Sequence, residues 1–192
     1  MPMKKLCIDI DNVLAQSDSV MRQLIKEHSA AGVQLDYCDI VDFAYWKCRD
    51  KNGNSITKDE WVKIHEEFSK EGNIMSIEPI PGACEYLKRL SDEGYELHLA
   101  TSRLDTARIP TIKWLKLHSF PNHWLHFVKS MEKHVVLQGF DAIIEDEREQ
   151  AAKFAELGTQ AFLLAHPWNE IPHGSQIIRV ENWRELYNKI RE

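Results

Sequence analysis

The sequence lacks several features that define other classes of protein. No apolar run approaches the roughly 20 residues that a membrane-spanning helix needs, and no glycine motif of a P-loop or a dinucleotide fold is present. The four cysteines include no Cys-x-x-Cys pair. We expect no secretory segment before the first strand, which begins within a few residues of Met1. The sequence therefore predicts a cytoplasmic protein with reduced thiols and no membrane partner.

Composition narrows the remaining classes. The chain has 192 residues, of which 43% are hydrophobic and 28% charged, as in ordinary soluble domains. This length suffices for one buried core with a small insertion. The net charge of -6 argues against a nucleic-acid polymer as partner, because such proteins carry a basic surface. A small phosphorylated substrate remains compatible, since a metal and a local cation can reverse the field inside one cleft.

The most unusual stretch is an apolar run, 6–8, that ends in Asp9-Ile10-Asp11. Buried strands avoid charge because unpaired charge is costly there. One interpretation is a strand followed by a helix cap at Asp11 or Asn12. The other is a Mg²⁺ site in which one carboxylate holds the metal and attacks phosphorus, while its neighbour carries a proton. The second interpretation requires a hydroxyl, a cation and a further acidic group elsewhere in the chain.

Hydrophobic periodicity predicts strands that alternate with helices. We expect strands near 6–10, 95–100, 127–128, 140–144, 161–165 and 177–180. We expect helices over 17–31 and 150–157, and a helix that begins at 81 and ends before Gly94. Further helices are expected to begin at 57 and at about 182, and another is expected to follow Asp105, which would be its cap. In the helix after Asp105, Ile109, Ile112 and Leu115 are expected to face inward, with Trp114 as a further candidate. This alternation predicts an α/β fold with a mainly parallel sheet flanked by helices.

The segment 17–76 looks helical and aromatic, and it contains no convincing strand. We therefore expect a small helical cap domain over 17–76, inserted after the first strand of a core domain formed by 1–16 and 77–192. Phe43, Tyr45 and Trp46 in this segment could form a substrate pocket that stacks a nucleobase. The alternative is that they are simply the core of the inserted segment.

Three predicted strands end in polar groups. Asp9 and Asp11 follow the first, Thr101 and Ser102 the second, and Glu145 and Asp146 the fourth. Sites in open parallel sheets form beyond the carboxyl ends of the strands, so these groups are expected at one edge. Each ending alone could be a helix cap. The cation that the site still needs has two candidates, Lys129 and Lys133.

This ordered set resembles the haloacid-dehalogenase-like (HAD-like) phosphohydrolases, over nearly the whole chain. Within that superfamily it looks most similar to the 5'(3')-deoxyribonucleotidases and their bacterial relatives. The stretches that carry the resemblance are IDIDNVLA, IEPIPGACEYLKRL, LATSR, MEKHVV, AIIED and ENWRELYNKI. The resemblance implies a Rossmann-like core and a Mg²⁺-dependent 5'-nucleotidase that acts through an aspartyl-phosphate.

The resemblance also implies a role for each residue. Asp9 would be the nucleophile and Asp11 the general acid and base. The phosphate would be bound by Thr101, Ser102 and Lys133, and the Mg²⁺ by Asp9, Asp11, Glu145 and Asp146. Glu145 departs from the family, whose members have Asp there. The substrate pocket matches poorly, so a phosphatase for another small metabolite and a non-catalytic ligand-binding protein stay open, as does a homodimer.

Overall fold

The computed structural model describes residues 4–121, 124–129 and 132–192, and its centre is a parallel sheet. The six strands lie in the order β3-β2-β1-β4-β5-β6, and every neighbouring pair runs parallel. The strands are β1 (Lys5–Asp9), β2 (Glu96–Thr101), β3 (Trp124–Phe127), β4 (Ala142–Glu145), β5 (Gln160–Leu164) and β6 (Ile178–Val180). The expected α/β fold is confirmed.

The described part of the chain contains eight α-helices, of which the last follows the final strand. They are α1 (Ser17–His28), α2 (Lys58–Phe68), α3 (Glu71–Met75), α4 (Ala83–Asp92), α5 (Arg108–Leu117), α6 (Lys133–Val136), α7 (Arg148–Glu156) and α8 (Trp183–Ile190). Local signals explain several boundaries. Thr57 and Glu60 form a capping box at the start of α2, and Asn182 caps α8 through the backbone N–H of Glu185.

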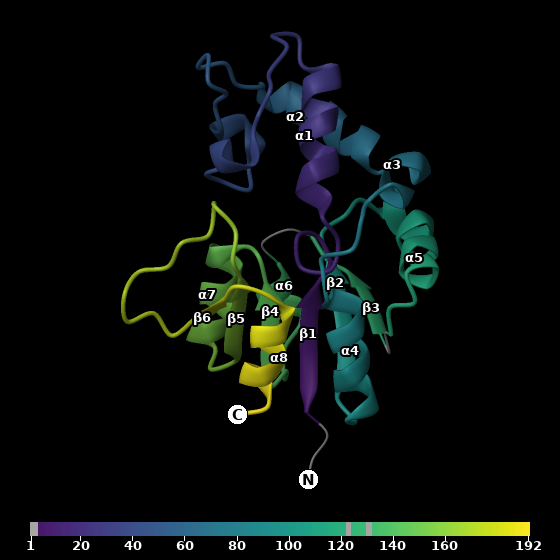
Figure 1. Cartoon of the computed structure of the whole chain (residues 1–192), viewed down its shortest axis with the longest axis vertical. Helices are drawn as coiled ribbons and strands as arrows, with labels where there is room; N and C mark the ends of the chain where they lie inside the picture. Colours follow the sequence, from purple (N-terminus) through teal and green to yellow (C-terminus); the bar gives the residue numbers. More distant parts are fainter. Residues whose placement is uncertain (1–3, 122–123, 130–131) are drawn as a thin grey trace.

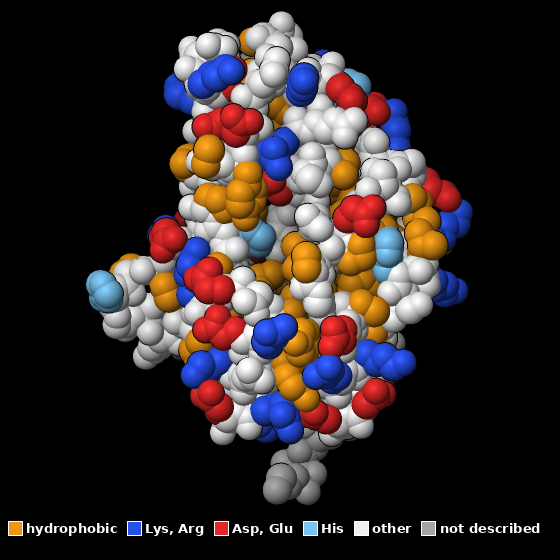
Figure 2. Space-filling model, in the orientation of Figure 1, with side chains coloured by type: hydrophobic (Ala, Val, Ile, Leu, Met, Phe, Trp, Pro, Cys, Tyr) orange, Lys and Arg blue, Asp and Glu red, His pale blue; other side chains and the backbone are white. Residues whose placement is uncertain are grey.

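The two faces of the sheet are buried by different helices. Side chains that alternate along a strand point to opposite faces. Leu6 and Ile8 join one cluster with the inner faces of α4 and α8, whereas Cys7 joins a second cluster with α7. Figure 1 shows α4 and α8 side by side along β1. On the face seen in Figure 2, Lys and Arg alternate with Asp and Glu over these helices, without a field of one sign.

The strand order creates a crevice at the carboxyl end of β1. The chain passes from β1 to β2 and β3 on one side, and then returns to β4, β5 and β6 on the other side. Ligands of open α/β sheets bind where the order reverses in this way. Asp9 is the last residue of the strand at that reversal.

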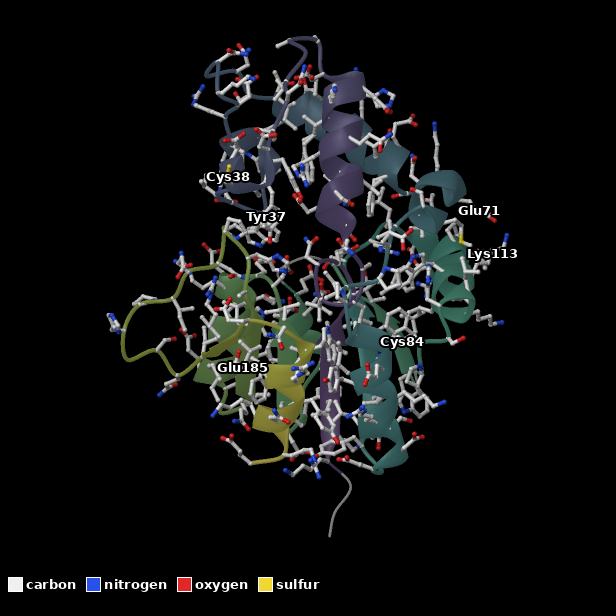
Figure 3. The ribbon with its side chains drawn as sticks, in the orientation of Figure 1. Tyr37, Cys38, Glu71, Cys84, Lys113 and Glu185 are labelled. Atoms are coloured by element: carbon white, nitrogen blue, oxygen red, sulfur yellow. The ribbon has the colours of Figure 1, made fainter. Side chains whose placement is uncertain are left out.

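The segment between β1 and α4 stands beyond these carboxyl ends, as Figure 1 shows for α1, α2 and α3. Its two connections to the sheet lie side by side: the N–H of Gln16 donates to Glu78 O at 2.9 Å, and that of Ile80 to Leu14 O at 2.8 Å. Away from these connections, Glu71 on α3 pairs with Lys113 on α5, with 2.7 Å between carboxylate and ammonium (Figure 3).

Some sequence expectations were wrong in detail. The third strand covers Trp124–Phe127, because its pairing with β2 sets its register, and α3 was not expected. Asp105 does not cap α5 but lies in a 3-10 turn and pairs with Arg108. Ile109, expected to face inward, is 60% exposed, whereas Leu115 and Trp114 are buried on the inner face. The four cysteines are free. Among the described residues, no helix could cross a membrane.

Candidate active site

A tight turn after β1 organises the site. Asn12 takes a left-handed conformation with φ of 58°, which Asn tolerates better than most residues. Its side-chain amide donates to Asp146 Oδ2 at 3.1 Å, and its Oδ1 accepts from the backbone N–H of Asp18 at 2.8 Å. The turn therefore links the end of β4 to the first turn of α1. His166 also contacts it, with Nε2 2.7 Å from Asn12 O.

Three buried carboxylates meet at this edge of the sheet. One oxygen each of Asp9, Glu145 and Asp146 lies within 4.8 Å of the others. Lys133, at the start of α6, places its ammonium 2.5 Å from Asp9 Oδ1 and 2.9 Å from Glu145 Oε1. We call Asp9, Glu145, Asp146 and Lys133 the acidic floor. Of the two candidate lysines, the structure therefore pairs Lys133 with Asp9, whereas the side chain of Lys129 is exposed.

Burial dominates the electrostatics of the acidic floor. It raises the pKa of Asp9 and of Glu145 to about 7, although Lys133 opposes the shift. Burial and the charge of Asp9 raise the pKa of Asp146 well above its usual range. Burial alone would lower the pKa of Lys133, but Asp9 and Glu145 outweigh it and raise that pKa well above normal. Ionised carboxylates are therefore costly here without further positive charge.

The donor set suits a divalent cation. Three carboxylates and one ammonium carry a net charge of -2 when all are ionised, which a divalent ion balances. All the converging ligand atoms are oxygens, and hard cations such as Mg²⁺ bind through oxygen. Glu145 also bonds to Lys133, whereas the Asp146 carboxylate bonds to Asn12. The residues present therefore fit the group that the sequence predicted.

Asp11 lies outside this group of three carboxylates and pairs with Arg103. The guanidinium donates to Asp11 Oδ1 from Nη2 at 2.7 Å and from Nε at 3.1 Å, and Nε also lies 3.1 Å from Oδ2. Burial tends to raise the pKa of Asp11, but the charge and hydrogen bonds of Arg103 outweigh it and lower that pKa. The contacts with Arg103 therefore favour the ionised form of Asp11 in the absence of substrate.

The two residues at the end of β2 play unequal parts. Thr101 is fully buried, and its hydroxyl lies 3.3 Å from Asp11 Oδ2. The same hydroxyl accepts from the backbone N–H of Arg103 at 3.2 Å. Ser102, in contrast, lines the cavity above the acidic floor. In this arrangement Ser102 is the better placed of the two to meet a substrate.

A cavity of about 320 Å³ opens above the acidic floor. Its opposite side is formed by the segment that follows β1. We call this side the aromatic wall, and it consists of Phe43, Tyr45, Trp46, Trp61, His65 and Phe68. The rings of Tyr45 and Trp61 stack at 5.2 Å between centroids, and those of Trp61 and His65 at 5.4 Å. The three aromatic residues expected in a substrate pocket all line this cavity.

Sequence reasoning missed several residues that line the cavity. Arg103 lines the cavity, although its side chain is only 1% exposed. Glu147 and Asp18 also line the cavity, and Asp18 accepts a hydrogen bond from Tyr45 at 2.8 Å. His65 follows Trp61 by four residues on α2, a spacing that places both on one face of a helix. That spacing was the available signal for His65.

Comparisons with known proteins identify the family of this chain. The family described as "5' nucleotidase, deoxy (Pyrimidine), cytosolic type C protein" matches residues 3–192. The chain belongs to this family. A Chlorobaculum tepidum protein named "Putative 5'(3')-deoxyribonucleotidase" is 36% identical over 191 residues, covering 96% of this chain and 88% of the relative. The resemblance found in the sequence is therefore confirmed at the level of the family.

Solved structures support the fold. A crystal structure described as that of "a predicted phosphatase from Clostridium acetobutylicum" superposes with a TM-score of 0.68 at 14% identity, covering 98% of each chain. A haloacid-dehalogenase-like protein from Agrobacterium tumefaciens gives a TM-score of 0.64 at 14% identity, again covering 98% of each chain. The protein is thus a phosphoric monoester hydrolase of the nucleotidase type, on a HAD-like fold.

Proposed function

We propose that this protein is a Mg²⁺-dependent phosphatase that hydrolyses nucleoside 5'-monophosphates, deoxyribonucleotides above all, through an aspartyl-phosphate on Asp9. The observation that carries the proposal is the juxtaposition of two surfaces across one cavity. One is the acidic floor with its single buried lysine, and the other is the aromatic wall. The floor suits a metal-bound phosphate, and the wall suits a planar group attached to it.

Residues of the floor would carry out the first step. An oxygen of Asp9 attacks phosphorus, and the bond from phosphorus to the substrate oxygen breaks. Asp11, whose protonation the negative charge of the bound phosphate would favour, gives its proton to the departing oxygen, so that no free alkoxide forms. Lys133, 2.5 Å from Asp9, offsets the negative charge that nucleophile and phosphate bring together. Ser102 and Thr101 would hold the phosphoryl oxygens, Ser102 more directly.

The second step would regenerate the enzyme. Asp11, now a carboxylate, takes a proton from water while the water oxygen attacks the phosphorus of the aspartyl-phosphate. The bond between phosphorus and the Asp9 oxygen breaks, which releases inorganic phosphate and returns Asp9 as a carboxylate. Asp11 is then protonated again and can serve the next substrate. The same side chain therefore acts as acid in one step and as base in the other.

The Mg²⁺ would be held by Asp9, Glu145, Asp146 and the backbone carbonyl of Asp11. When bound, it polarises the phosphoryl group and allows two anions to approach each other. The choice of Glu145 or Asp146 as direct ligand follows from their present contacts. Because Glu145 is already bonded to Lys133 at 2.9 Å, we assign the direct contact to Asp146 and a water-mediated one to Glu145.

The segment 17–76 would act as a cap domain over a core domain of 1–16 and 77–192. The paired connections at Leu14–Gln16 and Glu78–Ile80 support this division, since they are the places where the inserted segment leaves and returns. Phe43, Tyr45 and Trp46 would contact the base. The pyrimidine deoxynucleotide in the description of the matching family and the name of the relative support this substrate, in the cytoplasm.

The test is phosphate release from a panel of phosphomonoesters, measured with Mg²⁺ and with EDTA. The panel contains deoxyribonucleoside and ribonucleoside 5'-monophosphates, sugar phosphates and 4-nitrophenyl phosphate. We expect Mg²⁺-dependent release, with pyrimidine deoxyribonucleotides as the best substrates. A preference for a sugar phosphate would overturn the nucleotide assignment and keep the mechanism. Absence of release from every member would overturn the catalytic proposal.

A further inference from the structure

Arg103 has contacts that the proposed mechanism does not use. It follows Thr101 and Ser102 at the end of β2, and its side chain is 1% exposed. Its fork faces both oxygens of Asp11, while its Nη1 donates to the hydroxyl of Thr111 at 3.0 Å. An arginine this buried needs all its donors matched, because unpaired buried charge is expensive. Here the partner is the carboxylate proposed as acid and base.

The contacts leave Asp11 little freedom. Besides Arg103, the hydroxyl of Ser17 donates to Oδ1, and that of Thr101 lies 3.3 Å from Oδ2. Of these partners only Arg103 contacts both oxygens. A planar fork constrains the direction of a carboxylate, which a lysine ammonium or a single hydroxyl cannot do. The direction of Asp11 is therefore fixed chiefly by Arg103.

The guanidinium of Arg103 in turn packs against α2 of the segment 17–76. Its guanidinium carbon lies 5.5 Å from the centre of the Phe68 ring, at the end of α2, within the range of a cation–π contact. Phe68 stacks on His65, which stacks on Trp61. A continuous row of side chains thus runs from the aromatic wall through Arg103 to Asp11.

We propose that Arg103 is a positioning residue that orients Asp11 toward the leaving-group oxygen, and that the ring of Phe68 holds the Arg103 guanidinium in place. The inference rests on the proposed function, in which Asp11 donates a proton to that oxygen. It has a specific kinetic consequence. Charge develops on the leaving oxygen during phosphoryl transfer, so a basic alkoxide depends on the proton, whereas a weakly basic nitrophenolate departs without it. A change that moves the Asp11 carboxylate away from the leaving oxygen must therefore lower kcat/KM more for substrates with an alkoxide leaving group than for those with a nitrophenolate.

The experiment compares kcat/KM for thymidine 5'-monophosphate and for 4-nitrophenyl phosphate in the wild type and in Arg103→Met. The nucleotide value should fall about 100-fold or more, the usual scale of general acid catalysis. The value for 4-nitrophenyl phosphate should fall by less than about tenfold, because departure of its leaving group needs no acid. Arg103→Lys should recover part of the nucleotide activity. Equal losses on both substrates, or no loss, would overturn the proposal.

Matched variants distinguish the loss of Asp11 orientation from a general loss of activity or folding. Arg108→Met makes the same change in an exposed arginine that pairs with Asp105, and it should leave both substrates unaffected. Asp11→Asn should show the pattern of Arg103→Met, and the double variant should be no worse than Asp11→Asn, since both changes remove one function. If Arg103→Met fails to fold, Phe68→Leu should show the same unequal losses, at smaller size. Additive losses in the double variant would contradict the inference.

A crystal structure tests the role of Arg103 independently of whether the proposed enzymatic activity is correct. In a crystal structure of Arg103→Met, the Asp11 carboxylate should leave the position described above, while Asp9 and Lys133 stay in place. An Asp11 that keeps its position would overturn the role of Arg103, whatever the enzyme hydrolyses. If the wild type released no phosphate from any phosphomonoester, the proposed function would fail, and the position of Asp11 in this variant would still decide the inference.

Discussion

The acidic floor and the aromatic wall are built in different ways. Charged groups of the floor come from the ends of β1 and β4 and the start of α6, and specific hydrogen bonds fix them. The wall comes from α2 and from irregular chain before it, and ring contacts between 5.2 and 6.3 Å hold much of it. Directional bonds on a rigid sheet fix a geometry, whereas ring stacking tolerates different shapes. The floor is thus suited to chemistry, and the wall to selecting a substrate.

The largest effect that this comparison predicts is loss of the nucleophile. Asp9→Asn keeps an acceptor for Lys133 and nearly the same shape, but an amide cannot attack phosphorus. We expect the rate of phosphate release to fall at least about 10⁴-fold, as for other nucleophile variants. Asp105→Asn, in an exposed turn, serves as the control and should keep full activity. A phosphate-release assay that finds substantial turnover in Asp9→Asn would contradict the division of roles.

The next effect is on stability. Lys133→Met leaves Asp9 and Glu145 buried without their cation, which costs about 3 kcal/mol in the free energy of unfolding. Burial already raises both pKa values to about 7, and the loss of Lys133 raises them further. The wild-type carboxylates ionise as the pH rises through 7, whereas those of the folded variant stay protonated, so the variant loses stability relative to wild type above about pH 7.

Urea denaturation in EDTA at several pH values measures this effect. Lys129→Met removes an exposed lysine of the same region, and its free energy of unfolding should stay within about 0.5 kcal/mol of wild type. Mg²⁺ should recover part of the stability lost in Lys133→Met, because the ion supplies positive charge to the same carboxylates. A loss in Lys133→Met that does not depend on pH would argue against the described floor.

A smaller effect is expected at the aromatic wall. Trp46→Leu removes a ring that would stack on the base, and base stacking is worth about 1–3 kcal/mol. We expect KM for nucleoside monophosphates to rise about tenfold with little change in kcat, and KM for 4-nitrophenyl phosphate to change less. Trp124→Leu, on β3 and 55% exposed, is the control. A fall in kcat instead would show that the wall takes part in the chemistry.

The smallest effect concerns Asn12, which connects the floor to the first turn of α1. Asn12→Gly keeps the left-handed backbone and loses the bonds to Asp146 and Asp18, at about 1 kcal/mol of stability. Asn12→Ala should cost about 1 kcal/mol more, since it also strains the backbone. Thermal or urea denaturation of the pair measures the difference. An alanine variant more stable than the glycine variant would contradict the conformation described.

The floor was predictable because its residues follow from topology. Parallel strands bring their carboxyl ends to one edge, so Asp9, Glu145 and Asp146 could be grouped without knowing any distance. Choosing Lys133 over Lys129 needed either the resemblance or the structure, because both lie in the same connection. The burial of Arg103 was not predictable, since a charged residue after a strand is usually exposed and only its pairing with Asp11 makes burial tolerable.

The position of the aromatic wall and the buried faces of individual helices were harder to predict from the sequence. The sequence does not predict where the irregular chain around Phe43, Tyr45 and Trp46 lies relative to the sheet. Aromatic rings pack in several geometries, so the presence of three rings does not specify their partners. Ile109 was expected on the inner face of α5 but is exposed, whereas Trp114 is buried there and its indole N–H donates to Ile77 O at 2.7 Å. A contact with a distant segment thus decided which face is inside. Such contacts are what a single sequence does not reveal.

The central claim is that phosphoryl transfer passes through Asp9. The most direct measurement is mass spectrometry of the enzyme quenched in acid during turnover of thymidine 5'-monophosphate with Mg²⁺. The account predicts a peptide containing Asp9 that carries the mass of one phosphoryl group, absent in EDTA and in Asp9→Asn. Turnover at full rate with that peptide unmodified, or with the phosphoryl group on another residue, would contradict it.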